Sequence, residues 1–203
     1  MKDSIEEVLN NLRRPFVIPE DGTSQTRLSN TGRVGFYIER LFGIDPNNCR
    51  RPDFGNAELK TMQQGKKISI GTMPESEFRS IKNTMDHIFE QSDPYNKMKN
   101  TLVVVYQKLR NYPEPLYQME GWGTINLAKM PAHIKAALEK DYTGICKRIG
   151  HCNNRDQVTD IIMRHGSISG EYLTLGYKGQ GQNGYNYPSW EFQVKFTRLI
   201  THA

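Results

Sequence analysis

Asp53, Glu58 and Lys60 are the residues of this chain whose types and spacing could do chemistry together. The pair Gly55-Asn56 lies between the two carboxylates and suits the centre of a two-residue hairpin turn, where positive φ is needed. In such a hairpin Asp53 would lie opposite Glu58. Because side chains alternate along a strand, Glu58 and Lys60 would share one face. The sequence therefore predicts a polar cluster of two carboxylates and one ammonium group.

Two carboxylates about 5 Å apart across a strand pair repel each other unless a cation lies between them. Mg²⁺ takes oxygen ligands and keeps several waters, so it is the cofactor we expect at Asp53 and Glu58. Lys60 beside the ion could orient an attacking water or stabilise the charge on a phosphate. This layout is that of a phosphodiester hydrolase. The alternative is an ordinary solvated surface, where an Asp followed by Glu-x-Lys is common.

The helices and strands that must position the cluster follow from apolar spacing. Helical periodicity and capping residues predict helices at about 4–13, 32–42, 74–89, 131–140 and 156–164. Alternation and β-branched runs predict strands at 66–72, 101–106, 171–177 and 191–197. We expect Asp93-Pro94 to end the third helix and residues 113–129 to be irregular.

Composition limits the class of protein. The 203 residues include 27 Lys and Arg against 22 Asp and Glu, a formal net charge of +5 that weakly favours a polyanionic partner. No low-complexity linker divides the chain, so we expect a single domain over 1–203, with an N-terminal helix and loop at 1–28 and a C-terminal hairpin and DNA-reading loop at 165–203. No apolar run approaches the roughly 18 to 20 residues of a membrane span. We therefore expect no membrane partner and a cytoplasmic protein, associated with the nucleoid or, in a eukaryotic host, nuclear.

The loop between the last two expected strands combines glycines with polar and aromatic side chains. Asn and Gln can pair with adenine in the major groove, Tyr can stack or bind phosphate, and Gly allows close approach. The alternative is a long hairpin loop of favoured turn residues. The candidate DNA-binding residues of this loop are Lys178, Gln180, Gln182, Asn183, Tyr185 and Asn186.

Five matches in order, from about residue 29 to the C terminus, give the chain a family resemblance. They are Thr31-Gly-Arg-Val-Gly-Phe-Tyr-Ile-Glu39, Pro52-Asp-Phe54 with Glu58-Leu-Lys-Thr61, Asn96-Lys-Met98, Gly170-Glu-Tyr-Leu-Thr-Leu175, and Phe192 to Thr197. The chain resembles the MutH family, which unites the mismatch-repair nicking endonuclease MutH with restriction enzymes and is related to the MvaI/BcnI restriction enzymes. The four-residue gap between Asp53 and Glu58 is similar to the MvaI/BcnI spacing, whereas MutH-like members usually have a longer segment there.

The resemblance implies an α/β fold with a restriction-endonuclease-like PD-(D/E)xK core, a mixed β-sheet flanked by helices. Asp53 and Glu58 match the metal-binding carboxylates, Glu39 a helix-borne glutamate, and Lys97 a lysine ahead of the central strand. The implied catalytic set is Glu39, Asp53, Glu58, Lys60 and Lys97.

The C-terminal part departs from MutH. Gly176 stands about where MutH has an arginine that reads DNA, and Glu191 stands roughly in the place of a tyrosine that contacts DNA. The resemblance therefore implies nuclease chemistry without recognition of MutH's own GATC target.

The predicted activity is a Mg²⁺-dependent, site-specific double-stranded DNA endonuclease of type II restriction type, and the resemblance implies 5′-phosphate products. One alternative is a MutH-type strand-nicking endonuclease of mismatch repair, which would need a MutL-type activator. A further alternative is a non-catalytic DNA-binding module. One compact chain offers one active site, so cutting both strands would require a homodimer or two successive nicks.

Overall fold

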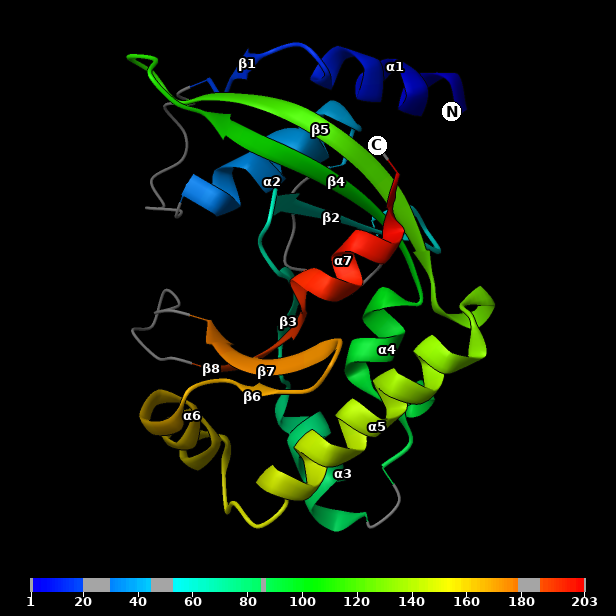
Figure 1. Ribbon diagram of the computed structural model, residues 1–203, viewed down its shortest axis with the longest axis vertical. Coiled ribbons are helices and arrows are strands. Elements are labelled where there is room, and N and C mark those ends of the chain that lie inside the picture. Colours follow the sequence, from blue (N-terminus) through cyan, green and yellow to red (C-terminus); the bar gives the residue numbers. More distant parts are fainter. Residues whose placement is uncertain (1, 20–29, 45–52, 85–86, 179–186, 203) are drawn as a thin grey trace. The chain divides into compact units, whose positions relative to one another are not determined.

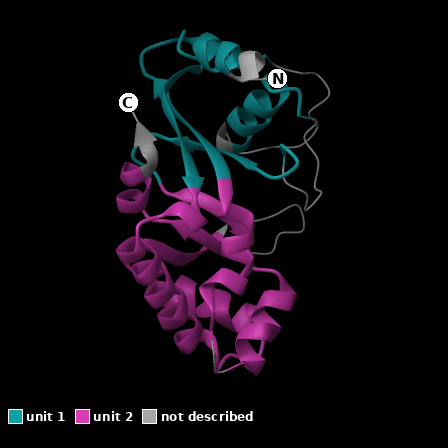
Figure 2. Cartoon of the chain, turned by 90° about the vertical axis from the view of Figure 1, so that its right-hand side faces the viewer, with its two compact units in different colours: residues 1–66, 101–125, 200–203 teal, residues 67–100, 126–199 magenta. Residues whose placement is uncertain are grey.

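The computed structural model describes residues 2–19, 30–44, 53–84, 87–178 and 187–202. The chain forms two compact units (Figure 2): unit 1 comprises residues 1–66, 101–125 and 200–203, and unit 2 comprises residues 67–100 and 126–199. Each unit contains its own β-sheet. The expected single domain over 1–203 stays a prediction.

Unit 1 is built on a mixed sheet. Its strand order is β1-β5-β4-β2, and β9 also pairs with β5. β2 runs parallel to β4, whereas β1 and β9 run antiparallel to β5. A mixed sheet flanked by helices is the expected fold, and it is confirmed. The strands are β1 (Phe16–Val17), β2 (Glu58–Gln63), β4 (Asn100–Leu109), β5 (Leu116–Asn126) and β9 (Thr201–His202).

Two helices contribute to the apolar core of unit 1, together with the strands. α1 (Lys2–Leu12) and α2 (Asn30–Leu41) correspond to the helices predicted at 4–13 and 32–42. Apolar residues three and four positions apart form one stripe on each helix. Leu12, Val34 and Ile38 from these stripes pack with Leu59 of β2 and Val104 of β4, all at most 2% exposed. The parallel strands β2 and β4 therefore pack against α2.

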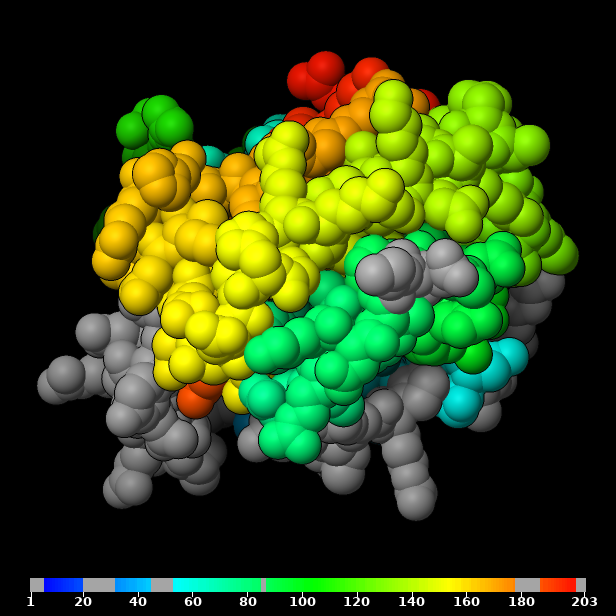
Figure 3. All heavy atoms as spheres, turned by 90° about the horizontal axis from the view of Figure 1, so that it is seen from below, coloured from blue at the N-terminus to red at the C-terminus, as the bar shows by residue number. Residues whose placement is uncertain are grey.

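Unit 2 is built on an antiparallel sheet of order β3-β8-β7-β6. α5 and α6 pack against this sheet (Figure 1), and α3 lies beside α5 on the face seen in Figure 3. Among helices in the described ranges, none has the length and apolar character needed to cross a bilayer. The elements of unit 2 are β3 (Ile68–Thr72), α3 (Glu75–Asn83), η1 (Phe89–Gln91), α4 (Asp93–Met98), η2 (Leu127–Lys129), α5 (Ala132–Ile149), α6 (Arg155–His165), β6 (Ile168–Ser169), β7 (Leu173–Lys178), β8 (Tyr187–Phe192) and α7 (Val194–Ile200).

The expectation of an irregular segment at 113–129 is wrong. Residues 116–126 form β5, which pairs with β1 and β9 and neighbours β4 in the sheet. Tyr117 and Met119 alternate with more exposed residues and face the core of unit 1. The glycines on either side of Trp122 interrupt this alternation in the sequence, although sheet pairing tolerates them.

Two helix assignments also differ from expectation. Asp93-Pro94 begins a helix rather than ending one, because Ser92 Oγ accepts the N–H of Tyr95 as an N-cap and proline is favoured in the first turn. The preceding helix α3 ends at Asn83.

The strand expected at 191–197 ends at Phe192, and residues 194–200 are helical. Phe196 of α7 lies against Phe192 at the end of β8, with ring centroids 4.1 Å apart. An isolated apolar alternation does not distinguish this arrangement from a strand.

Candidate active site

The predicted turn at Gly55-Asn56 is present. In the described residues, however, β2 does not pair across this turn with an antiparallel strand. Gly55 has φ of 76°, and the N–H of Phe54 donates to the carbonyl of Ala57 at 2.8 Å. Glu58 then starts β2, whose partner is the distant parallel strand β4. In the described part of the chain, no strand leads into this turn. The turn therefore delivers Asp53 to the start of β2.

Asp53 is held there by its side chain. Its Oδ2 accepts the backbone N–H of Leu59 at 2.8 Å. On either side of Leu59, Glu58 and Lys60 share a face of the strand, and Lys60 Nζ lies 2.5 Å from Glu58 Oε1. Both side chains are mostly buried, with 23% of Lys60 and 22% of Glu58 exposed. Two carboxylates and one ammonium group thus gather within one turn and the first residues of one strand.

The register of β2 is fixed by Leu59, which is 2% exposed in the core of unit 1. Because side chains alternate along a strand, burying Leu59 directs Glu58 and Lys60 to the opposite face. A slip of one residue would bury both charges. The same apolar contact that stabilises unit 1 therefore orients the polar cluster.

Glu39 of α2 belongs to the same electrostatic environment. Burial raises the pKa of the Glu39 carboxyl above its ordinary value, the charge of Asp53 raises it further, Lys60 lowers it, and Glu58 raises it. α2 approaches β2 closely at Gly35, where a Cβ would lie 3.3 Å from Thr61 Oγ1. α2 thus contributes a third carboxylate, which interacts electrostatically with Asp53, Glu58 and Lys60.

The donor chemistry of this cluster fits a hard divalent cation. In the described ranges, no three His, Cys, Asp or Glu side chains form a complete metal-binding group. Mg²⁺ is nevertheless commonly held by one or two carboxylates, with waters and phosphate oxygens completing its ligands. Asp53 and Glu58 supply such oxygens. Burial is the main cause of the raised pKa of Glu39, and the charges of Asp53 and Glu58 add to it.

Lys97, the fifth residue of the expected catalytic set, belongs to α4 of unit 2. Its Nζ lies 2.8 Å from Asp93 Oδ2, one helical turn earlier. A Cβ placed on Gly71 of β3 would lie 3.1 Å from the same Nζ. Its role beside Asp53 stays a prediction. The sequence reasoning missed Asp93, although its i,i+4 spacing to a lysine was a usable signal.

Most of the expected DNA-reading loop lies outside the described residues, namely Gln180, Gln182, Asn183, Tyr185 and Asn186. Lys178 is the last residue of β7. Tyr187 begins β8 after the loop, and the guanidinium of Arg155 lies 5.2 Å from its ring centroid. The DNA-binding role of the loop stays a prediction.

The two departures from the MutH pattern are spatial neighbours. A Cβ on Gly176 would lie 3.1 Å from Glu191 Oε2, so the glutamate occupies space beside the glycine. Glu191 also pairs with Lys67 at 3.4 Å. A larger side chain at position 176 would require the Glu191 carboxylate and the Ser167 hydroxyl to shift.

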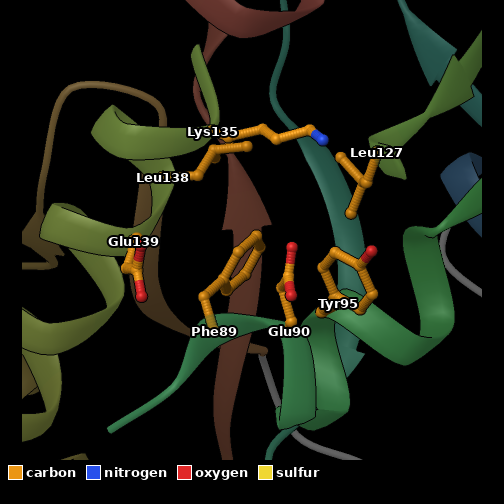
Figure 4. A pocket seen from close by; sticks show the side chains of 7 residues that line it. All are labelled: Phe89, Glu90, Tyr95, Leu127, Lys135, Leu138 and Glu139. Carbon is orange, nitrogen blue, oxygen red and sulfur yellow. The ribbon is translucent and has the colours of Figure 1, made fainter. Parts of the chain in front are cut away.

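A separate small pocket lies in unit 2 beside α4 (Figure 4). Phe89 and Tyr95 line it from one side and Leu138 of α5 from the other, while Lys135 at its rim donates to the carbonyl of Ala128 at 2.6 Å. Its volume is about 30 Å³, enough for a few water molecules at most. This pocket is too small to hold a nucleotide.

Comparison with known proteins places this geometry in context. Residues 13–113 match the MvaI/BcnI restriction endonuclease family. A similar solved structure is described as "Restriction endonuclease MvaI-cognate DNA substrate complex"; its TM-score is 0.51 at 10% sequence identity, and the match covers 99% of this chain and 94% of that one. At that identity the likeness shows a shared restriction-endonuclease fold. No curated protein sequence matches the chain.

Proposed function

We propose that this chain is a Mg²⁺-dependent, site-specific endonuclease that cuts both strands of DNA and leaves 5′-phosphates, because residues 13–113 match the MvaI/BcnI restriction endonuclease family. The match to this restriction endonuclease family supports a type II DNA endonuclease. The observation that carries the finer proposal is the cluster at the start of β2, where Asp53 is bonded to the strand and Lys60 Nζ lies 2.5 Å from Glu58 Oε1.

In this proposal Asp53 and Glu58 hold the metal ion. When bound, Mg²⁺ lowers the pKa of a coordinated water and neutralises charge on the scissile phosphate. Leu59 keeps Asp53 in place by its backbone N–H, so that carboxylate does not have to be ordered when the ion arrives. Such preorganisation avoids reorganisation cost during the reaction.

Lys60 places a positive charge beside Glu58. Its ammonium group donates to Glu58 and is positioned to orient a water or to stabilise negative charge on a phosphate oxygen. Glu39 has a raised pKa, so its carboxyl retains a proton to higher pH than an ordinary glutamate. A cation at the cluster would favour loss of that proton and make Glu39 an acceptor for a water molecule. Lys97 would contact a phosphate.

The test is cleavage of supercoiled, unmethylated plasmid DNA with Mg²⁺. We expect discrete linear products that share one terminal sequence, and no cleavage in EDTA. Asp53→Ala and Lys60→Ala should each slow cleavage by about 10²–10³-fold or more while keeping the fold. Arg79→Ala is the matched control, because the Arg79 side chain is 73% exposed and its ion pair lies on the surface of α3.

A folded Asp53→Ala or Lys60→Ala variant that cleaves as fast as the parent would refute the proposal. Nicked circles as the final product would favour the strand-nicking alternative and a search for a MutL-type activator. If linear products form, the dependence of their rate on protein concentration separates a homodimer from two successive nicks by one chain.

A further inference from the structure

Unit 2 contains a buried carboxylate that the proposed chemistry does not use. Glu77 of α3 is only 8% exposed. Its Oε1 accepts the hydroxyl of Tyr142 on α5 at 2.6 Å, and its Oε2 accepts the backbone N–H of Asp93 on α4 at 3.1 Å. Burial raises the pKa of Glu77, and these two bonds oppose that shift. One carboxylate thus joins three helices.

The network continues from Asp93 to Lys97. Asp93 Oδ2 lies 2.8 Å from Lys97 Nζ, and the two side chains are 24% and 32% exposed. Gly71 adjoins the register shift in the pairing of β3 with β8. The ammonium group lies against this glycine, where a Cβ would come within 3.1 Å of Nζ. The ammonium group of Lys97 therefore lies between the Asp93 carboxylate and the backbone of Gly71, which has no side chain to displace it.

The first turn of α4 is fixed from a second direction as well. Ser92 Oγ accepts the N–H of Tyr95 at 3.2 Å and donates to the carbonyl of Phe89 at 2.5 Å. Together with the Glu77 bond to Asp93, this cap determines where the helix starts and hence where Lys97 points one turn later. A lysine whose side chain is restrained in this way loses less freedom when it binds an anion.

A purely structural tie between helices does not require a buried charge. Removing a carboxylate from water costs free energy, and apolar packing of similar volume often stabilises a protein as well or better. Buried titratable groups linked to a partly exposed charge are instead typical of functional sites. We propose that Glu77 and Asp93 are positioning residues that hold the Lys97 ammonium group over Gly71 for contact with a phosphate of the DNA. This inference rests on the proposed nuclease function.

The experiment compares four variants in single-turnover cleavage, with DNA affinity measured in Ca²⁺ and stability measured by urea unfolding. The variants are Asp93→Asn, Glu77→Gln, Lys97→Ala and the double variant Asp93→Asn/Lys97→Ala, with Arg79→Ala as the control for loss of an exposed i,i+4 ion pair. Asp93→Asn keeps the backbone N–H that Glu77 accepts, and Glu77→Gln keeps one carbonyl acceptor at nearly the same shape. Both are chosen so that the fold is retained.

We expect Lys97→Ala to lower the cleavage rate roughly 10- to 100-fold, and Asp93→Asn and Glu77→Gln to lower it by a smaller factor, because misplacing a reacting group by about 1 Å costs up to this much. Adding Asp93→Asn to Lys97→Ala should produce no further loss, since both changes act through the same ammonium group. A merely structural Asp93 would lower the rates of the parent and of Lys97→Ala by the same factor.

Equal factors in the two backgrounds, or a folded Asp93→Asn variant that cleaves at the parental rate, would overturn the positioning role. Parental cleavage by Lys97→Ala would overturn it too, because there would be no lysine function to position. These outcomes differ from failure of the proposed function, in which the parent itself does not cleave or a folded Asp53→Ala variant cleaves like the parent.

Discussion

Replacing Gly170 by alanine should disrupt the entry into β7. Just before that strand, the backbone wraps around the carboxylate of Asp141, a side chain that is 9% exposed. Its Oδ1 accepts the N–H of Glu171 at 2.9 Å, and its Oδ2 accepts those of Tyr172 at 2.7 Å and Leu173 at 3.0 Å. A Cβ on Gly170 would lie 2.2 Å from both Cγ and Oδ1 of Asp141. The alanine methyl group and this carboxylate cannot occupy the same place.

The expected loss of stability follows from the bonds that Asp141 would give up. Two of the three, to Tyr172 and Leu173, are buried. A hydrogen bond to a charged acceptor contributes about 1.5–3 kcal/mol, so losing both should lower the free energy of unfolding by about 3–6 kcal/mol. The N–H of Glu171 is only partly buried and can bond to water instead. Since a whole domain is stable by about 5–15 kcal/mol, this is a large fraction of the total.

Urea unfolding followed by tryptophan fluorescence measures this loss. Trp190 is fully buried in the sheet of unit 2, and a Trp122→Phe background removes the signal of the exposed Trp122 in unit 1. Gly144→Ala is the matched control, because a Cβ there meets nothing within 4 Å and the residue lies inside α5. That variant should be more stable by about 0.5–1 kcal/mol. If Gly170→Ala is as stable as the parent, the account of Asp141 is wrong.

Two further predictions concern Glu39 and Ser92. The raised pKa of Glu39 means that the folded state binds its proton more tightly than the unfolded state does, so the protein should gain stability as pH falls through the folded pKa and lose it as pH rises. Glu39→Gln should therefore stabilise the metal-free protein at neutral pH and flatten the pH dependence of urea unfolding; an unchanged pH dependence would contradict this. Ser92→Ala should lower stability by about 1 kcal/mol through loss of the α4 cap, and a Thr variant should restore most of it, whereas equal losses in both would argue against capping.

The polar cluster of unit 1 could be predicted because it is local. Asp53, Glu58 and Lys60 lie within eight positions, and a turn followed by strand alternation is enough to bring them together. The strand that pairs with β2 could not be predicted from the sequence. A Gly-Asn turn is compatible with a hairpin, yet the partner strand is β4, with Glu58 paired to Thr101 in parallel. That choice depends on long-range packing under α2 rather than on the turn.

For β5, the sequence predicted an irregular segment where the structure has a regular strand. Its buried residues Tyr117, Met119 and Ile125 alternate in the usual way, but glycines flank Trp122 in the middle of the strand. Glycine weakens an isolated strand and reads as a breaker in sequence. Neighbouring strands on both sides of β5 compensate for that weakness, and they are known only from the folded sheet.

The contacts around Lys97 could not be predicted from the local sequence for a different reason. Glu77 is four residues before Ile81, so helical spacing places its charged side chain on the buried face of α3. A buried carboxylate needs hydrogen-bond or charge partners. Those partners, Asp93 and Tyr142, are 16 and 65 positions away. A periodic pattern can show that a carboxylate is buried but cannot show which donors satisfy it. The charge on the buried helix face was readable from the sequence, whereas its link to Lys97 depends on how three helices of unit 2 pack.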